Sequence, residues 1–331
     1  MKEYQAERDV AVKAVRLAAI LCRDVQAEVK PEALEKKDRS PVTIADYGSQ
    51  ALVLKELEAA FPDDLVIAEE GADALRDPEN SEIAGKMMDH IRRILPDAGR
   101  EEVFGWIDRG THREYADRFW TLDPIDGTKG FLRGEQYAVS LALIVNGEIV
   151  VGALACPNIS SYLPEAMHSD AVFVAVKGEG AWLLPGGDSE PVRLSTSGLT
   201  DSSGARFVES FESGHSDHSW SQNVAESLGI TREPVRLDSQ AKYAILASGA
   251  ADLYLRLPTK PGYVEKIWDH AAGVLIVQEA GGTVSDIEGN DLDFTQGYGL
   301  TRNRGVLVSG GNFHQKLVEV VREAGEGSAK Q

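Results

Sequence analysis

Two carboxylates, Asp123 and Asp126, stand three residues apart in the stretch WTLDPIDGTKGF. Pro124 lies between them and lacks a backbone N–H, so regular strand pairing is expected to be interrupted there. Gly127 permits a turn, and Thr128 adds a hydroxyl beside the acids. Taken alone, DPIDGT is more typical of an ordinary turn and helix cap, because Asp, Pro and Gly are common turn residues. Its chemistry therefore depends on what else the chain brings near it.

Three further stretches place acids where regular elements are expected to begin or end. Asp46 follows SPVTIA at the expected start of a helix. Glu69 and Glu70 end the expected strand LVIAEE, and Asp269 lies in EKIWDHAAG, where a strand is expected to give way to a helix. Layered folds assemble their sites at such positions. If these acids converge, their charges are tolerable only when some are protonated or cations lie among them.

The residue types indicate which cations. Carboxylate oxygens without a nearby set of Cys and His favour Mg²⁺, Mn²⁺ or Ca²⁺, and pairs of Mg²⁺ ions typically serve phosphate chemistry. A sharp turn at Pro124 would also bring the carbonyl of Ile125 beside Asp123 and Asp126 as a ligand. Amides at the start of the following helix would be placed to hold a phosphate oxygen. The sequence therefore predicts a metal site for a phosphate-bearing substrate.

The composition excludes several classes of partner. The chain has 331 residues, a formal charge of −19 and 43% hydrophobic residues, which suits about two domains or one large layered one. Such acidity argues against nucleic-acid polymers and anionic membranes, whose binding depends on Lys and Arg. No apolar run approaches the ~20 residues of a membrane helix, and no signal-peptide pattern is present.

Cys22 and Cys156 lie outside any CxxC spacing, which fits buried thiols in a reducing compartment. We expect a cytoplasmic protein.

Periodicity predicts the elements that position these residues. Helical spacing is expected over residues 6–29 and again from SPVTIAD onward, with one helix, SEIAGKMMDHIRRIL, inside the polar stretch 71–117. Apolar runs on either side of Asn146 and Gly147 predict a hairpin, and a second such pair follows it. We expect an antiparallel sheet over residues 118–195, covered by the N-terminal helices.

After LSTSG, strands and helices alternate, which predicts a second α/β layer and a layered α/β (α+β) fold. The expected elements are strands at 205–210, 234–239 and 252–258 and helices at 218–229, 240–249 and 269–282. We expect an N-terminal α+β domain over 1–196 and a C-terminal α/β domain over 197–331.

Four segments, PVTIAD, AEE, WTLDPIDGTKGF and WDHAAG, together resemble the Mg²⁺-dependent, lithium-sensitive phosphatase superfamily of inositol monophosphatase and fructose-1,6-bisphosphatase. Within it, SPVTIADYGSQA, DSQAKYAILASGAADLYLRLP and YVEKIWDHAAG are similar to the 3′(2′),5′-bisphosphate nucleotidase branch. The resemblance covers nearly the whole chain and is weakest at 71–117 and 183–205. Ala68 departs from the family pattern, which usually has Gly before the two acids.

The resemblance implies α-β-α-β-α layers and hydrolysis of the 3′-phosphate of adenosine 3′,5′-bisphosphate, with 3′-phosphoadenylyl sulfate as a second substrate and a role in sulfur assimilation. It implies two or three Mg²⁺ ions, inhibition by Li⁺ and a small-molecule partner, and we favour a monomer. The implied metal ligands are Glu69, Asp123, the carbonyl of Ile125, Asp126 and Asp269. Asp46 and Thr128 match the pair that orients and deprotonates the attacking water.

The implied substrate contacts are Thr128, His215, Ser239, Lys242 and Arg256. Without the resemblance, Lys242 would be read as part of a solvated helix face, and His215 as a surface or capping residue. Arg256 interrupts the apolar strand DLYLRLP and therefore needs a partner.

Two alternatives stay open. An inositol phosphate phosphatase would share the acidic set, so only the region around Ser239, Lys242 and Arg256 separates it from a nucleotidase. A catalytically idle sensor of metal or nucleotide would have no need of the water-activating pair, and the presence of Thr128 with every expected acid argues against it.

Overall fold

A computed structural model describes residues 3–29, 40–159, 163, 171–186, 189–211, 218–258, 260 and 262–328. The predicted nucleotide contact His215 lies outside these residues. Across the described part of the chain, none of the helices combines the length and the apolarity that crossing a bilayer requires.

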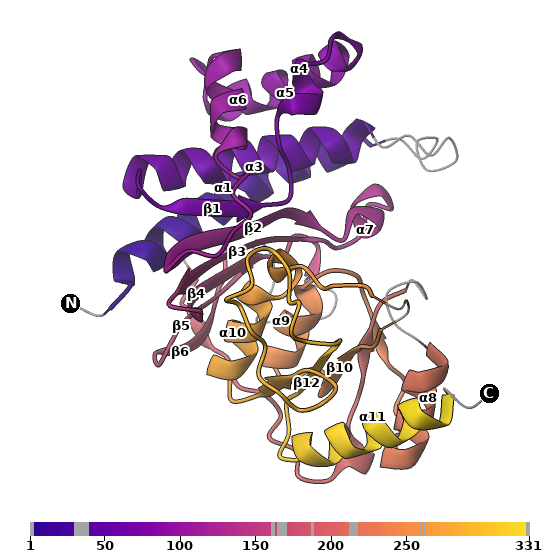
Figure 1. Ribbon diagram of the computed structural model, residues 1–331. Helices are drawn as coiled ribbons and strands as arrows, with labels where there is room; N and C mark the ends of the chain where they lie inside the picture. The colour runs from indigo at the N-terminus through magenta and orange to yellow at the C-terminus, as the bar shows by residue number, and fades with distance from the viewer. Residues whose placement is uncertain are drawn as a thin grey trace.

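The outer helical layer is built on two long helices, α1 (Gln5–Ala27) and α3 (Ser40–Ala60), which pack on each other and on one face of the main sheet (Figure 1). The helix predicted over 6–29 is thus confirmed as α1. On the other side of α3 lie α5 (Ser81–Ile94) and α6 (Arg100–Asp108), with the short helix α4 (Asp73–Arg76) beside α5. The stretch 71–117 therefore holds more than the single helix predicted. Helix α6 was not predicted because its few apolar residues stand among charged ones in the sequence.

The main sheet has seven strands in chain order. They are β1 (Leu65–Ala68), β2 (Arg118–Asp126), β3 (Ala138–Val145), β4 (Glu148–Ala155), β5 (Val172–Val176), β6 (Gly180–Leu184) and β7 (Val192–Arg193). From β2 to β7 all pairs are antiparallel, as predicted, and the turn at Asn146 and Gly147 has φ values of 52° and 81°. Only β1 pairs in parallel, with β2, because the connection between them runs through helices.

Strand β2 carries a bulge at Pro124. Asp123 pairs with Ser140 and Asp126 pairs with Ala138, so β2 holds one more residue than β3 over this interval. The predicted interruption of regular pairing is therefore confirmed, although the strand continues past the proline to Asp126. From α3, the Ser49 hydroxyl donates to the Pro124 carbonyl at 2.9 Å and holds the bulge in place.

The opposite face of the main sheet is covered by α10 (Ala271–Glu279), with α9 (Ala241–Ala247) beside it (Figure 1). Gly152 of β4 allows the close approach of α10, because a Cβ at this position would lie 2.9 Å from the Ala272 carbonyl oxygen. Large apolar side chains from both halves of the chain, including Phe173 and Ile276, share this core. The domain boundary after residue 196 stays a prediction.

A second, three-stranded antiparallel sheet lies beyond these helices, in the order β10, β12, β11. Its strands are β10 (Leu253–Arg256), β11 (Thr283–Ser285) and β12 (Val306–Ser309). The short strands β8 (Val208–Glu209) and β9 (Val235–Arg236) pair in parallel, and α8 (His218–Leu228) and α11 (His314–Ser328) form the outermost layer (Figure 1). The α-β-α-β-α layering expected from the resemblance is confirmed, while β11, β12 and α11 were not predicted.

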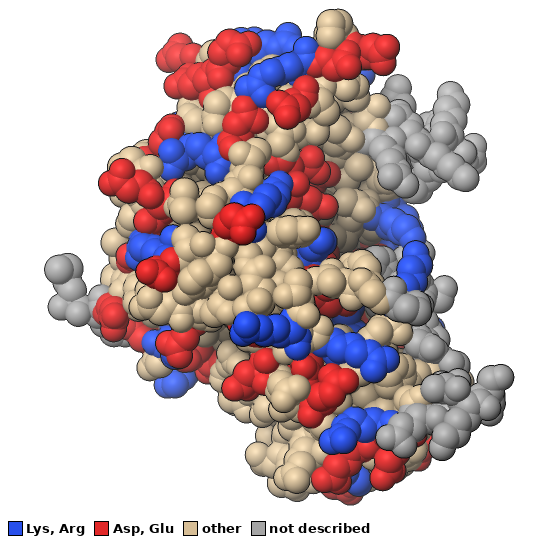
Figure 2. All heavy atoms as spheres, viewed as in Figure 1, with Lys and Arg blue, Asp and Glu red and all other residues tan. Residues whose placement is uncertain are grey.

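The surface mixes charges of both signs. Among the described residues on the face drawn in Figure 2, Lys and Arg lie interspersed with Asp and Glu over the upper helices and over the lower layer. Binding to a nucleic-acid polymer calls instead for a continuous basic surface.

Candidate active site

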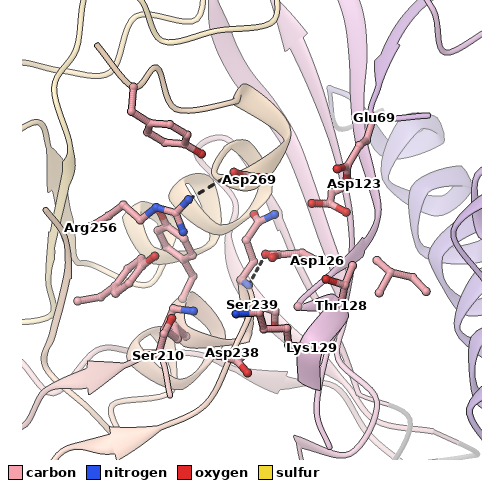
Figure 3. Close-up of a pocket in the computed structure, with 17 residues that line it drawn as sticks. Glu69, Asp123, Asp126, Thr128, Lys129, Ser210, Asp238, Ser239, Arg256 and Asp269 are labelled. Atoms are coloured by element: carbon pink, nitrogen blue, oxygen red, sulfur yellow. Dashed lines mark hydrogen bonds and ion pairs between the residues drawn. The ribbon is translucent and has the colours of Figure 1, made fainter. Parts of the chain in front are cut away.

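A pocket of about 270 Å³ lies where the ends of β1 and β2 face α9 and β10. It brings together most of the residues predicted from sequence: Glu69, Asp123, Ile125, Asp126, Thr128, Ser239, Lys242, Arg256 and Asp269. Figure 3 shows Glu69 and Asp123 on one side of the pocket and Arg256 on the other, with Asp269 beside Arg256. We name the carboxylates Glu69, Asp123, Asp126 and Asp269 the acid wall, and the cations Lys242 and Arg256 the cation wall.

The parallel pairing of β1 with β2 builds the acid wall. Ala68 pairs with Leu122, so the residues that follow them, Glu69 just after β1 and Asp123 within β2, lie side by side. Ala68 fits its place because Gly110 lies opposite, where a Cβ would stand 2.7 Å from the Ala68 Cβ. The acids thus come from neighbouring strands that are far apart in sequence.

The other two acids arrive from different directions. Asp126 follows the bulge at the end of β2, and Asp269 is the last residue of a short 3₁₀ turn, η6 (Ile267–Asp269), directly before α10. In the described chain, Lys266 before this turn makes only an isolated bridge, so the strand expected ahead of Asp269 is absent.

Crowding and burial oppose ionisation of the acid wall. Burial and then the charges of Glu69 and Asp126 raise the pKa of Asp123 well above its usual range. The pKa of Glu69 is also raised, by burial first and then by Asp269. Among the described residues, one carboxylate oxygen of Asp123 and one of Asp46 are buried without a hydrogen-bond partner. An all-oxygen donor set with unsatisfied carboxylates fits hard divalent cations such as Mg²⁺, which would relieve the repulsion.

Asp46 does not stand at a helix start, as the sequence had suggested. Helix α3 begins at Ser40, with Pro41 in its first turn, and Asp46 lies in its second turn. Its side chain is buried, and its pKa is raised by burial and by the charges of Glu69 and Glu70. Asp46 therefore approaches the acid wall from within a helix, behind the residues that line the pocket.

Thr128 begins the short helix α7 (Thr128–Leu132), as expected from the turn residues before it. Gly127 has a φ of 93°, which favours glycine, and a Cβ there would lie 2.9 Å from the Ser239 Cβ. The turn thus brings Thr128 into the pocket and presses β2 against the loop that carries Ser239. Ser239 itself has a φ of 70°, an uncommon value for a serine.

The cation wall differs between its two members. Lys242 on α9 is only 3% exposed, so the solvated helix face considered from sequence is wrong. Its ammonium lies 5.3 Å from the centre of the Tyr254 ring, and burial lowers its pKa to about 8. Among the described residues it has no ion pair. It is therefore a buried cation that faces the pocket without a carboxylate of its own.

Arg256 on β10 has the partners that its place in an apolar strand required. Its Nε donates to Glu265 at 3.1 Å, and its Nη2 lies 3.7 Å from Oδ2 of Asp269. His270 contacts Glu265 through Nε2 at 3.2 Å, and the Tyr243 hydroxyl lies 2.7 Å from His270 Nδ1. Although burial alone would raise the pKa of Glu265, His270 and Arg256 lower it to about 2.

Among the described residues, Glu265, Asp269 and His270 also form a group whose possible ligand atoms lie within 4.8 Å of one another. Since Glu265 and His270 are already engaged with Arg256 and Tyr243, we regard this group as support for Arg256 rather than as a separate metal centre. Glu265 and His270 were not predicted from the sequence, because nothing in EKIWDH shows that its Glu and His are buried.

The fold and the sequence both place this pocket in a known family. Residues 3–326 match the inositol monophosphatase family. The solved inositol monophosphatase from Anabaena has the same fold, with a TM-score of 0.63 at 20% identity over 98% of this chain and 97% of that one. The chain therefore belongs to the inositol monophosphatase family.

Its relatives of higher identity share one name. The 3′(2′),5′-bisphosphate nucleotidase of Schizosaccharomyces pombe is 42% identical, covering 96% of this chain and 95% of that protein. The 3′(2′),5′-bisphosphate nucleotidase of Oryza sativa is also 42% identical, covering 97% and 95%.

Proposed function

We propose that this protein is a metal-dependent phosphatase that removes the 3′-phosphate of adenosine 3′,5′-bisphosphate, giving AMP and inorganic phosphate. The observation that carries the proposal is one pocket lined by four carboxylates and by two cations, the buried Lys242 and the mostly buried Arg256. A substrate with one phosphate to be hydrolysed and a second to be held matches this division. The names of the relatives at 42% identity support the same substrate. We also propose 3′-phosphoadenylyl sulfate as a second substrate.

The acid wall holds the cations in this proposal. Glu69, Asp123, Asp126 and Asp269, with the Ile125 carbonyl, would be the ligands of two or three Mg²⁺ ions. When bound, Mg²⁺ supplies the charge that stabilises the developing phosphoryl transition state and lowers the pKa of water. We further propose that the protein acts as a monomer in the cytoplasm.

Thr128 and Asp46 serve the attacking water. The Thr128 side chain lines the pocket at the start of α7, so its hydroxyl can orient the water toward the phosphorus. Asp46 lies behind it with a buried oxygen that has no partner among the described residues, and it accepts the proton that the water releases.

The cation wall holds the second phosphate. Lys242 has no ion pair among the described residues, so its ammonium is available to a phosphate that enters the pocket. Arg256 contributes its guanidinium while Glu265 holds it in place, and Ser239 and His215 complete the proposed nucleotide contacts. This arrangement favours a nucleotide bisphosphate over an inositol monophosphate, because the latter has nothing to offer the cation wall.

A phosphate-release assay with Mg²⁺ tests the proposal. The panel is adenosine 3′,5′-bisphosphate, 3′-AMP, inositol 1-phosphate, inositol 1,4-bisphosphate and fructose 1,6-bisphosphate. The comparison with 3′-AMP isolates the second phosphate, whose loss should lower kcat/KM by about 30- to 1,000-fold, since it leaves two charged groups without their ligand. A higher kcat/KM for an inositol phosphate would contradict the proposal and favour the inositol phosphatase.

A further inference from the structure

Gln240 is a buried residue that contacts the backbone on both sides of Asp269. Its side chain is 1% exposed. The amide Nε2 donates to the Trp268 carbonyl at 2.7 Å, and Oε1 accepts from the Gly273 amide at 3.2 Å. One side-chain amide thus bridges the residue before Asp269 and the first turn of α10, where backbone amides lack partners within the helix.

The backbone of the same residue contacts the other end of the acid wall. The Gln240 amide donates to Oδ2 of Asp126 at 2.6 Å, as the dashed line in Figure 3 shows. Asp126 belongs to β2 in the first half of the chain, and Asp269 precedes α10 in the second half. Gln240 is therefore in contact with segments that carry two predicted ligands from opposite halves of the fold.

The loop that carries Gln240 is itself held firmly. Gln136 donates through its side-chain amide to the Asp238 carbonyl and to the Ser239 hydroxyl. Ser239 keeps its left-handed conformation against Gly127, where no Cβ fits. A backbone conformation of this kind costs on the order of 1 kcal/mol and persists only when its surroundings determine it. The loop thus acts as a fixed support from which Gln240 reaches Asp126 and the backbone on either side of Asp269.

We propose that Gln240 is a positioning residue that sets the spacing between Asp126 and Asp269 and thereby the affinity of the acid wall for Mg²⁺. This inference rests on the proposed function only in assuming that the acid wall binds Mg²⁺. A purely structural role, capping α10, would stabilise the fold without affecting the binding of metal. The two roles differ in a measurement that requires neither nucleotide nor turnover.

The test compares Mg²⁺ binding by calorimetry, without nucleotide, in the full chain and three variants. Gln240→Met keeps the length of the side chain and removes both amide contacts. Gln240→Asn keeps the amide but is too short to span them. Asn303→Leu is the matched control, because the Asn303 amide also bridges backbone groups, donating to the Asp291 carbonyl at 2.9 Å and accepting from the Asp293 amide at 2.7 Å, and it does not line the pocket.

We expect both Gln240 variants to bind Mg²⁺ about 10- to 100-fold more weakly than the wild type, the usual range for residues that orient metal ligands. Asn303→Leu should bind Mg²⁺ within about twofold of the wild type, even where thermal unfolding in EDTA shows a similar loss of stability. Adding Mg²⁺ should then raise the Tm of Asn303→Leu as much as that of the wild type, and raise the Tm of the Gln240 variants less.

Wild-type Mg²⁺ affinity in a folded Gln240→Asn protein would overturn the proposal, whether or not Gln240→Met folds. An equal loss of Mg²⁺ affinity in Asn303→Leu would also overturn it, since the effect would then follow from stability alone. If the wild type takes up no Mg²⁺, the metal site and this inference fail together. If it binds Mg²⁺ but no substrate in the panel is hydrolysed, only the proposed substrate fails.

Discussion

The acid wall and the cation wall face each other across one pocket, yet they are built in opposite ways. On the acid wall, Asp123 is buried with a raised pKa, and one of its oxygens has no hydrogen-bond partner among the described residues. On the cation wall, Arg256 is held by Glu265, Glu265 contacts His270, and His270 contacts the Tyr243 hydroxyl. The arrangement of carboxylates is unfavourable until cations arrive, whereas the Arg256 network is complete within the fold.

This difference indicates how the acid wall and the Arg256 network affect the stability of the fold. Gathering carboxylates in a buried site costs stability, which a bound divalent cation would return through binding linkage. The Arg256 network instead contributes to the fold itself, because breaking a buried ion pair leaves an uncompensated charge. Removing an acid and removing Arg256 should therefore have opposite effects on stability, and both should reduce activity.

The largest effect is expected for Asp123→Asn. Loss of one metal ligand should lower kcat for adenosine 3′,5′-bisphosphate by more than about 1,000-fold, because transition-state charge is left unstabilised. Without metal, the same variant should be as stable as the wild type or more stable, since one crowded carboxyl is gone. Phosphate release and thermal unfolding in EDTA measure the two outcomes. Near-normal turnover, or a clear drop of Tm in EDTA, would contradict the contrast between the walls.

Arg256→Ala should come next, with a loss of about 2–4 kcal/mol in transition-state stabilisation for the bisphosphate. Unlike Asp123→Asn, it should also destabilise the fold, because Glu265 is only 7% exposed and would lose its ion-pair partner. Since Arg256 also lies 3.7 Å from Asp269, part of the loss should extend to 3′-AMP. Kinetics on both substrates and denaturant unfolding would check this. An unchanged free energy of unfolding would contradict the view that the Arg256 network stabilises the fold.

The role of Lys242 on the cation wall can be tested through the pH dependence of kcat/KM. Its pKa of about 8 lies below the usual 10.5, so its ammonium loses its charge as the pH rises through about 8. The value of kcat/KM for the bisphosphate should fall about tenfold between pH 7.5 and 9.5 in the wild type, because a charged hydrogen bond is lost. This fall should be absent in Lys242→Met, because its kcat/KM should already be at the lower value at pH 7.5. Lys177→Met, which changes a surface lysine outside the pocket, should keep the wild-type profile.

The same shift fixes the sign of the effect of Lys242 on stability. A lysine whose pKa is lower in the folded state destabilises the fold at pH values below its folded pKa, and the penalty disappears as the pH rises from about 8 toward 10.5. Lys242→Met should therefore raise the Tm at pH 7 and raise it less at pH 10. A constant difference in Tm between Lys242→Met and the wild type across this range would show that burying the charged Lys242 does not destabilise the fold.

The smallest effect is expected for the contact between the turn at Gly127 and the loop that carries Ser239. Gly127→Ala places a Cβ 2.9 Å from the Ser239 Cβ at a φ of 93°, so we expect a loss of about 1–2 kcal/mol in unfolding free energy. Both Thr128 and Ser239 should shift, and kcat should fall several-fold while the Mg²⁺ affinity changes little. Gly134→Ala, with a φ of 72° but open space around its Cβ, separates backbone strain from the clash. Equal losses in the two variants would show that the contact with Ser239 does not matter.

The sequence predicted the acids better than their surroundings. Hydrophobic periodicity and the Asn146–Gly147 turn led to the correct antiparallel sheet, and the positions of Glu69 and Asp126 at strand ends led to their convergence. Asp46 was expected at a helix start, whereas α3 begins at Ser40 and continues through SPVTIA, although its β-branched residues are weak helix formers.

The supporting residues could not be predicted in the same way. Gln240, Glu265 and His270 are buried polar residues, and a sequence pattern shows neither their burial nor their partners. Strands β11 and β12 lie between turns rich in Gly, Asn and Asp, which hide their short apolar runs. Each of these features depends on contacts between segments distant in the chain rather than on local periodicity.

The covering of the main sheet by α10 has a consequence for how the protein is made. The last strand of that sheet ends at Arg193, whereas α10 ends only at Glu279, so at ribosomal speeds of about 5–20 residues per second the two are separated by several seconds or more. During this time the nascent sheet exposes Leu154 and Phe173, which are fully buried in the finished fold. The short edge strand β7 limits pairing with other chains, but the open apolar face stays exposed to aggregation until α10 is made. Since Asp269 is translated near the end of this interval, the nascent chain stays inactive until its apolar face is about to be covered.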